Sequence, residues 1–254
     1  MDKSMVDLYV KFKKIRNMGY IKGINNSQNS SGLTFEALLG KEKDEFFLPD
    51  YNGIEIKTKK GYSKSKITLF TANPDSMYLY ALKNLVTNYG VDGKRFLTEF
   101  SSLEKHRYNG HYFKIIVDWK KKVVALLIYD KRGVLISNEV YWTFDLLKER
   151  LTLKLSKLAL VKCCTKKIDG IEHYWYYRIY FYKNVNFKKF LQAIEKGIIT
   201  IRFSVGTYLT GPRVGEIHNH GIGFLIAEEN LKDIYTPIFN NSNINNSLTT
   251  NEIK

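Results

Sequence analysis

The segment 48–58 constrains this chain more than any other part of its sequence. Residues 50–53, Asp-Tyr-Asn-Gly, are a turn signal, and the alternating apolar and polar run that follows predicts a β-strand. Successive side chains on a strand point to opposite faces, so Glu55 and Lys57 project to one face and the isoleucines beside them project to the other. Asp50 directly precedes this strand and is placed to fold back beside Glu55.

Two carboxylates and an ammonium in one small volume predict a metal-assisted phosphodiester-cleaving site. Mg²⁺ binds through one or two carboxylates plus phosphate oxygens, and a lysine adds positive charge beside the attacked phosphate. The same residues also fit a half-exposed hairpin, in which Asp50 caps the turn and Glu55 pairs with Lys57 across solvent. The short pattern alone leaves both interpretations open.

The charge of the chain favours a polyanionic partner. Its 254 residues include 40 Lys and Arg against 25 Asp and Glu, a net charge of +15. Nucleic acid is the first candidate for such a partner and an anionic membrane the second. No apolar run reaches membrane-spanning length, which argues against a membrane partner, and the start of the chain is acidic where a signal peptide carries positive charge. We therefore expect a cytoplasmic protein.

The two cysteines, Cys163 and Cys164, are adjacent and cannot form an ordinary disulfide framework. They end an apolar stretch that begins at Leu158, so we expect a buried strand thiol. With 44% hydrophobic residues the chain can bury a substantial core.

The periodicity of the sequence predicts an α/β fold with a mixed β-sheet flanked by helices. A mobile loop is expected at 23–32, Thr34 and Thr143 are expected helix caps, and the strand at 67–71 is expected to neighbour the Glu55 strand. The predicted helices cover 4–18, 34–39, 75–89, 93–104, 143–155 and 186–197. The further predicted strands cover 112–119, 122–130, 134–138, 157–165, 171–182, 198–208 and 221–227, and a short helix closes the fold. Residues 240–254 are Asn-, Ser- and Thr-rich and predict a disordered tail.

A second polar cluster lies at 202–221, which reads as a long, shaped loop between strands. Arginine and asparagine are the side chains best matched to guanine and adenine edges in the major groove, and such contacts usually sit on loops. Zinc binding by His218 and His220, a solvated turn, and histidines that satisfy local backbone groups are the alternatives. The candidate DNA contacts are Arg202, Tyr208, Arg213, His218 and His220.

These segments together resemble the MvaI/BcnI type of restriction endonuclease, a branch of the PD-(D/E)xK nucleases related to the mismatch-repair enzyme MutH. Residues 32–40 are similar to the family's Gly-x-Thr-x-Glu-x-Leu-Leu helix, and 48–58 are similar to its catalytic turn and strand. The similarity continues through 67–71, 113–119, 140–145 and 217–221, so it covers roughly 5–235, with the MvaI side closest.

The resemblance implies a PD-(D/E)xK core and a Mg²⁺-dependent type II restriction endonuclease. Such an enzyme recognises short, pseudo-palindromic CC-N-GG-type sites in double-stranded DNA, acts as a monomer and cuts the two strands in sequence. A cognate cytosine methyltransferase is then a genetic, not physical, partner. We expect a nuclease domain over 1–239, in two lobes around a DNA cleft.

By the same resemblance, Asp50 and Glu55 are metal ligands, and Lys57 positions the attacking water and stabilises the developing charge. Glu36 matches a helix glutamate that supports the metal site. The alternative interpretation is an acidic residue at the start of a helix, where the helix dipole favours negative charge. His218 and His220 match a segment at the DNA surface.

One position departs from the family pattern. After the His-x-His-Gly segment, the family enzyme whose site has an A·T or T·A central pair carries an arginine directly after a phenylalanine. This chain has Leu225 directly after Phe224. Leucine donates no hydrogen bond to a base edge, so we expect the central pair to be read differently.

Two other functions compete with the restriction interpretation. One is a non-catalytic, basic DNA-binding protein with a decayed nuclease fold, and the presence of Asp50, Glu55 and Lys57 argues against it. The other is a MutH-like nickase that needs a partner to act.

Overall fold

The protein is described here by a computed structural model that covers residues 2–40, 48–75 and 78–240. The chain divides into two compact units. Unit 1 consists of Met1–Ser65, Thr152–Val185 and Tyr235–Lys254; unit 2 consists of Lys66–Leu151 and Asn186–Ile234.

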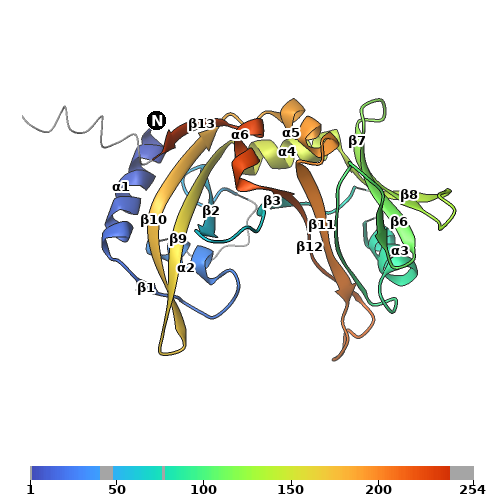
Figure 1. Ribbon diagram of the computed structural model, residues 1–254, viewed down its shortest axis with the longest axis horizontal. Coiled ribbons are helices and arrows are strands. Elements are labelled where there is room, and N and C mark those ends of the chain that lie inside the picture. The colour runs from blue at the N-terminus through green and yellow to red at the C-terminus, as the bar shows by residue number, and fades with distance from the viewer. Residues whose placement is uncertain (1, 41–47, 76–77, 241–254) are drawn as a thin grey trace, which may run out of the picture. The chain divides into compact units, whose positions relative to one another are not determined.

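Unit 1 is built around a five-stranded mixed sheet (Figure 1). The strand order is β1-β10-β9-β2, and β13 pairs with another stretch of β10. Only the β2–β9 pair is parallel. The elements are α1 (Lys3–Asn17), β1 (Ile21–Lys22), α2 (Ser30–Leu38), β2 (Glu55–Lys60), β9 (Lys157–Ile168), β10 (Ile171–Lys183) and β13 (Thr236–Asn240).

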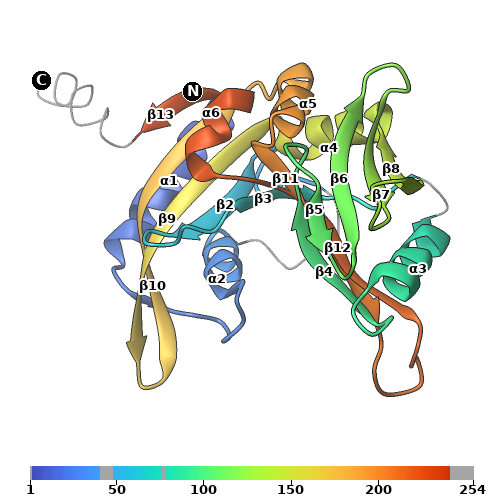
Figure 2. The same cartoon turned by 45° about the vertical axis from the view of Figure 1, so that its right-hand side comes forward.

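One face of this sheet carries the core of unit 1, and α1 lies against that face (Figures 1 and 2). The Asp2 carboxylate caps α1 by accepting from the Met5 amide at 3.1 Å. Apolar residues at helical spacing then pack on the strands. The core comprises Met5, Leu8, Phe12, Ile15, Phe35, Leu39, Ile54, Ile56, Ala159, Val161, Cys163, Tyr174, Tyr176, Ile179 and Phe181.

Unit 2 contains two four-stranded sheets, ordered β3-β12-β11-β4 and β5-β6-β7-β8, and every pair in them is antiparallel. Aromatic rings fill its interior; the rings of Phe100 and Phe113, for example, stack 4.8 Å apart. Its strands are β3 (Ile67–Thr71), β4 (Arg95–Phe100), β5 (His106–Tyr108), β6 (His111–Asp118), β7 (Val123–Tyr129), β8 (Leu135–Thr143), β11 (Ile199–Thr207) and β12 (Ile217–Ile226). Its helices are α3 (Tyr78–Tyr89), α5 (Phe187–Glu195), the 3₁₀ turn η1 (Glu228–Asn230) and α6 (Leu231–Ile234), and α4 (Phe144–Leu155) leads from unit 2 into unit 1.

The predicted α/β class with a mixed sheet is confirmed, although the strands form three sheets. Most predicted elements are present, including the α4 cap, where the Leu146 amide donates to the Thr143 hydroxyl at 3.3 Å. Cys163 is buried and neither cysteine forms a disulfide. The predicted tail lies outside the described residues, except for Asn240, which ends β13.

Three predicted elements are wrong. Residues 93–104 contain a strand, β4, because Phe96 and Phe100 share a face at strand spacing as well as at helical spacing, and pairing with β11 selects the strand. The 67–71 strand pairs with β12 and not with β2, whose partner is β9. The helix predicted to start at Thr34 begins at Ser30, and Thr34 instead donates to the Ser30 carbonyl within the helix at 2.7 Å.

Candidate active site and candidate DNA-contact residues

A tight two-residue turn sets up the catalytic candidates in unit 1. The Tyr51 and Ile54 backbones exchange hydrogen bonds of 2.9 and 2.8 Å, and Asn52 and Gly53 between them have φ values of 43° and 79°. Positive φ at both central residues is the type I′ geometry that Asn-Gly favours. Behind the turn, an Asp50 carboxylate oxygen accepts from the Ile56 amide at 2.9 Å. The predicted fold-back of Asp50 beside the start of β2 is therefore confirmed.

Glu55 is buried, with a relative exposure of 1%, and two lysines hold one of its oxygens. The Lys57 ammonium donates to Oε1 at 2.6 Å, and the Lys154 ammonium lies 3.5 Å from the same atom. The Glu55–Lys57 pair of the alternative interpretation is present, but Glu55 is buried and does not pair across solvent. Sequence reasoning missed Lys154, since α4 brings it to β2 from nearly a hundred positions away in the chain.

The electrostatics of Glu55 are those of a carboxylate held in a dry site. Burial raises its pKa, the Lys57 charge opposes that rise, the Asp50 charge adds to it, and Lys154 opposes it. The net shift is upward despite two neighbouring cations. A further positive charge in this pocket would favour the ionised carboxylate.

The residues present fit a divalent cation such as Mg²⁺. Glu55 Oε2 is buried and forms no hydrogen bond, so this oxygen is left with an unfilled acceptor. Among the described residues, no group of three or more His, Cys, Asp and Glu side chains forms a cation site. Two carboxylates, completed by water and phosphate oxygens, are a normal protein contribution for Mg²⁺.

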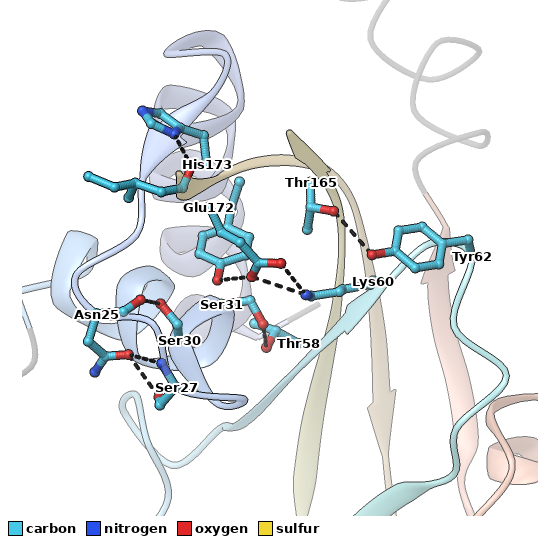
Figure 3. Close-up of polar contacts among 12 residues, drawn as sticks. Asn25, Ser27, Ser30, Ser31, Thr58, Lys60, Tyr62, Thr165, Glu172 and His173 are labelled. Carbon is cyan, nitrogen blue, oxygen red and sulfur yellow. Dashed lines mark hydrogen bonds and ion pairs between the residues drawn. The ribbon is translucent and has the colours of Figure 1, made fainter. Parts of the chain in front are cut away.

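Glu36 lies on α2 near the middle of β2. A Cβ atom at Gly32 would lie 3.3 Å from the Thr58 hydroxyl and 3.8 Å from Glu36 Oε1, so the helix packs closely on β2 at this glycine. The Ser31 and Thr58 hydroxyls are 3.3 Å apart and link the same two elements (Figure 3). The support of Glu36 for a metal site stays a prediction.

A polar network fixes the far end of β2. Figure 3 shows the Lys60 ammonium against the Glu172 carboxylate, with distances of 3.0 and 3.1 Å to its oxygens. Tyr174 donates to the same carboxylate at 2.7 Å. Beside it, the Tyr62 and Thr165 hydroxyls lie 3.1 Å apart. These contacts tie β2 to β9 and β10, which holds the strand that carries Glu55 and Lys57.

Four of the predicted DNA-contact residues form one stacked column in unit 2. The Arg213 guanidinium lies 4.4 Å above the Tyr208 ring, which stacks on His218 at 4.3 Å and 9°. The centroids of the His218 and His220 rings lie 3.9 Å apart, with the ring planes tilted by 47°. Arg213 also donates to Glu216 at 2.7 Å and to the Tyr208 hydroxyl at 3.0 Å. The column consists of aromatic rings and a guanidinium from the β11–β12 hairpin. The loop of this hairpin spans 208–216 and is shorter than predicted.

The fifth predicted contact, Arg202, lies apart from this column. It sits within β11 and donates to Glu99 at 3.0 and 3.2 Å, while Glu99 also accepts from Lys66 and Thr200 at 2.6 Å each. Leu225, at the position that departs from the family pattern, is fully buried in β12. The different reading of the central pair stays a prediction.

Asp50, Glu55 and Lys57 lie at one turn and strand of a mixed sheet, which matches the pattern of the PD-(D/E)xK nucleases. The sequence model of the MvaI/BcnI restriction endonuclease family matches residues 9–235 of this chain. The chain therefore belongs to the MvaI/BcnI restriction endonuclease family, and it is a type II site-specific endonuclease.

Solved structures agree with this assignment. The restriction endonuclease MvaI in complex with its cognate DNA substrate is similar at a TM-score of 0.86, with 30% identity over 94% of this chain and 98% of that chain. MvaI in the absence of DNA is similar at a TM-score of 0.63, with the same identity and coverage. No curated protein sequence matches the chain. Within the described residues, no helix is long and apolar enough to cross a membrane.

Proposed function

We propose that this chain hydrolyses double-stranded DNA at a CC-N-GG-type site, with Mg²⁺ as cofactor, and that it acts as a monomer that nicks the two strands in sequence. The observation that carries the proposal is the buried Glu55 carboxylate, with Lys57 on one oxygen and no partner on the other. The sequence similarity to MvaI, whose solved complex contains cognate DNA, supports the substrate class.

Each group of the site has a role in this reaction. Asp50 and Glu55 hold the cation, which when bound polarises the phosphate and lowers the pKa of a water molecule. Lys57 orients the attacking water and stabilises charge that develops on the phosphate, because it lies on the same strand face as Glu55. Lys154 adds positive charge beside Glu55 Oε1, and Glu36 supports the arrangement from α2.

Recognition is assigned to the column of unit 2. Arg213 reads guanine, with Tyr208 beneath it, and His218 and His220 contact the DNA next to it. Arg202 is the weakest candidate, because Glu99 already holds its guanidinium. The net charge of +15 supplies phosphate contacts, so binding weakens steeply as salt rises. A flat salt dependence contradicts a DNA partner.

Supercoiled plasmid incubated with Mg²⁺, beside an EDTA control, tests the proposal. We expect an open-circle intermediate followed by linear DNA in Mg²⁺ alone. Open circles that never become linear indicate the MutH-like nickase, and unchanged plasmid that still binds the protein indicates a non-catalytic DNA-binding protein. Sedimentation of the protein on a single-site duplex tests the monomer.

Four duplexes that differ only in the central pair test the site. Since the buried Leu225 supplies no contact, the outer CC and GG pairs carry the discrimination in this proposal. Cleavage of duplexes without the CC-N-GG frame contradicts it. Methylation of the site's cytosines by a cognate methyltransferase, the expected genetic partner, should block cleavage.

A further inference from the structure

The candidate catalytic residues lie on the face of the unit 1 sheet that is opposite its core. Ile56 of β2 belongs to the core against which α1 packs. Its neighbours Glu55 and Lys57 project to the other face, because successive side chains on a strand alternate. This second face, defined by Glu55 and Lys57, is called the Glu55 face.

Strand β10 places two more polar side chains on the Glu55 face. Ile179 belongs to the core, so its neighbours Arg178 and Tyr180 project away from the core. The register puts Tyr180 in line with Lys57, because Lys57 pairs with Leu160 and Leu160 pairs with Tyr180. Two strand spacings of about 4.8 Å separate the two backbones, a span of about 10 Å.

The next row of the Glu55 face consists of three cations. Lys59 pairs with Lys162, and Lys162 pairs with Arg178. Both lysines are buried, whereas Arg178 is exposed. Arg178 is therefore the cation of this row that an incoming DNA strand can reach.

The Arg178 guanidinium is held by a phenol and not by a carboxylate. It donates to the Tyr180 hydroxyl at 3.3 Å and forms no ion pair within the described ranges. Arg202, by contrast, donates to the Glu99 carboxylate. A guanidinium offers a planar fork of donors that matches a phosphate, and the phenol hydroxyl offers a further donor beside it.

We propose that Arg178 and Tyr180 form a phosphate-binding site for the DNA backbone, on the Glu55 face and away from the bond that is cut. For a strand that runs across β9, the span of about 10 Å from Lys57 corresponds to about three nucleotides, since each rises about 3.4 Å. The contact adds affinity without sequence preference, because it touches no base. This inference rests on the proposed function, because that function places the cleaved bond at Glu55 and Lys57.

The first test compares Arg178→Gln with Arg16→Gln. Arg16 is the matched control, because it is an exposed arginine of the same unit on α1, which packs on the opposite face of the sheet. The readout is the dissociation constant for a duplex that the wild-type chain cleaves, measured in Ca²⁺ at several salt concentrations. A duplex without the site serves as the second probe.

We expect Arg178→Gln to bind both duplexes about tenfold more weakly at low salt, because a charge-assisted hydrogen bond is lost. The slope of log Kd against log salt should fall by about one, since one phosphate contact is removed. Arg16→Gln should bind both duplexes like wild type with an unchanged slope.

Uncharged methylphosphonate linkages locate the contact, when they replace one phosphate of the cleaved duplex at a time. One replacement, about three nucleotides from the cut, should weaken wild-type binding about tenfold. The same replacement should leave Arg178→Gln binding unchanged, because that interaction is already absent. Tyr180→Phe should lose less than Arg178→Gln and should be sensitive at the same linkage, because it removes only one donor.

Unchanged binding by Arg178→Gln overturns the inference and leaves the proposed function intact. Losses that add to the methylphosphonate effect at every linkage also overturn it, because Arg178 then contacts no particular phosphate. Equal weakening in Arg16→Gln overturns it as well, since the effect is then one of net charge. A wild-type chain that neither binds the duplex in Ca²⁺ nor cleaves it in Mg²⁺ removes the proposed function and this inference together.

Discussion

The turn in front of β2 and the β11–β12 hairpin use polar side chains in opposite ways. Glu55, which follows the first turn, is 1% exposed and is held by Lys57 and by the sheet to which its strand belongs. Arg213, on the second, has a side chain that is 57% exposed and is held by stacking and by Glu216. A group that stabilises charge in a reaction gains from a dry, rigid setting, whereas a group that reads a base has to reach an incoming partner. Under the proposed function, the two regions carry separable roles, catalysis and recognition.

The largest expected effect comes from the buried carboxylate. Glu55→Gln keeps the shape of the side chain and removes its charge, so cleavage should fall about 1000-fold, while DNA binding in Ca²⁺ survives. Plasmid cleavage and filter binding measure the two quantities. Glu139→Gln, at an exposed carboxylate of β8 in unit 2, is the control and should cleave like wild type. Full activity in Glu55→Gln would remove this residue from the site.

The two lysines beside Glu55 should contribute unequally to the cleavage rate. Lys57→Met should lower the single-turnover rate about 100-fold, since Lys57 contacts Oε1 at 2.6 Å and faces the reacting phosphate. Lys154→Met should cost only about tenfold, because its ammonium lies at 3.5 Å and acts through Glu55. The reverse order would show that Lys154 is the catalytic lysine.

The Arg213→Ala variant should lose sequence discrimination but still cleave DNA. Discrimination at one G·C pair should drop by about 1–3 kcal/mol, provided that the guanidinium reads guanine. Cleavage of matched duplexes with single-pair changes measures it. Arg132→Ala, an exposed arginine beside Asp130 in the same unit, should change nothing. Equal weakening on every duplex would reassign Arg213 to a phosphate contact.

The smallest effect should come from the turn itself. Gly53→Ala and Gly19→Ala place a side chain at φ values of 79° and 72°, and neither new Cβ meets an atom within 4 Å. Both should lower the free energy of unfolding by about 1 kcal/mol through backbone strain alone. Only Gly53→Ala should also slow cleavage, because Asp50 depends on that turn. Denaturant melts and cleavage rates test this, and equal activity in both variants would separate the turn from catalysis.

Local patterns predicted the turn in front of β2 correctly, because its determinants are contiguous. The Asn-Gly turn, the alternation through β2 and the return of Asp50 all depend on residues within a few positions of each other. Contacts between segments that are distant in the sequence could not be predicted from such local patterns. Lys154 reaches Glu55 through α4, so no spacing in the sequence indicates it.

Errors in the fold have the same origin. Phe96 and Phe100 satisfy helical and strand periodicity equally, and only the partner strand β11 decides between them. No local pattern indicates that Leu225 is buried in β12 or that Arg202 donates to Glu99, because both depend on the pairing of distant strands.

The separation of catalysis from recognition is tested most directly by sequencing the DNA ends that the protein leaves on a randomised duplex library in Mg²⁺. The wild-type chain should give ends in a single CC-N-GG frame, Glu55→Gln should give none above the EDTA control, and Arg213→Ala should give ends at a wider set of sites. Ends in the wild-type frame from Glu55→Gln would contradict the account. So would ends from Arg213→Ala that stay confined to the wild-type site while the cleavage rate is lost.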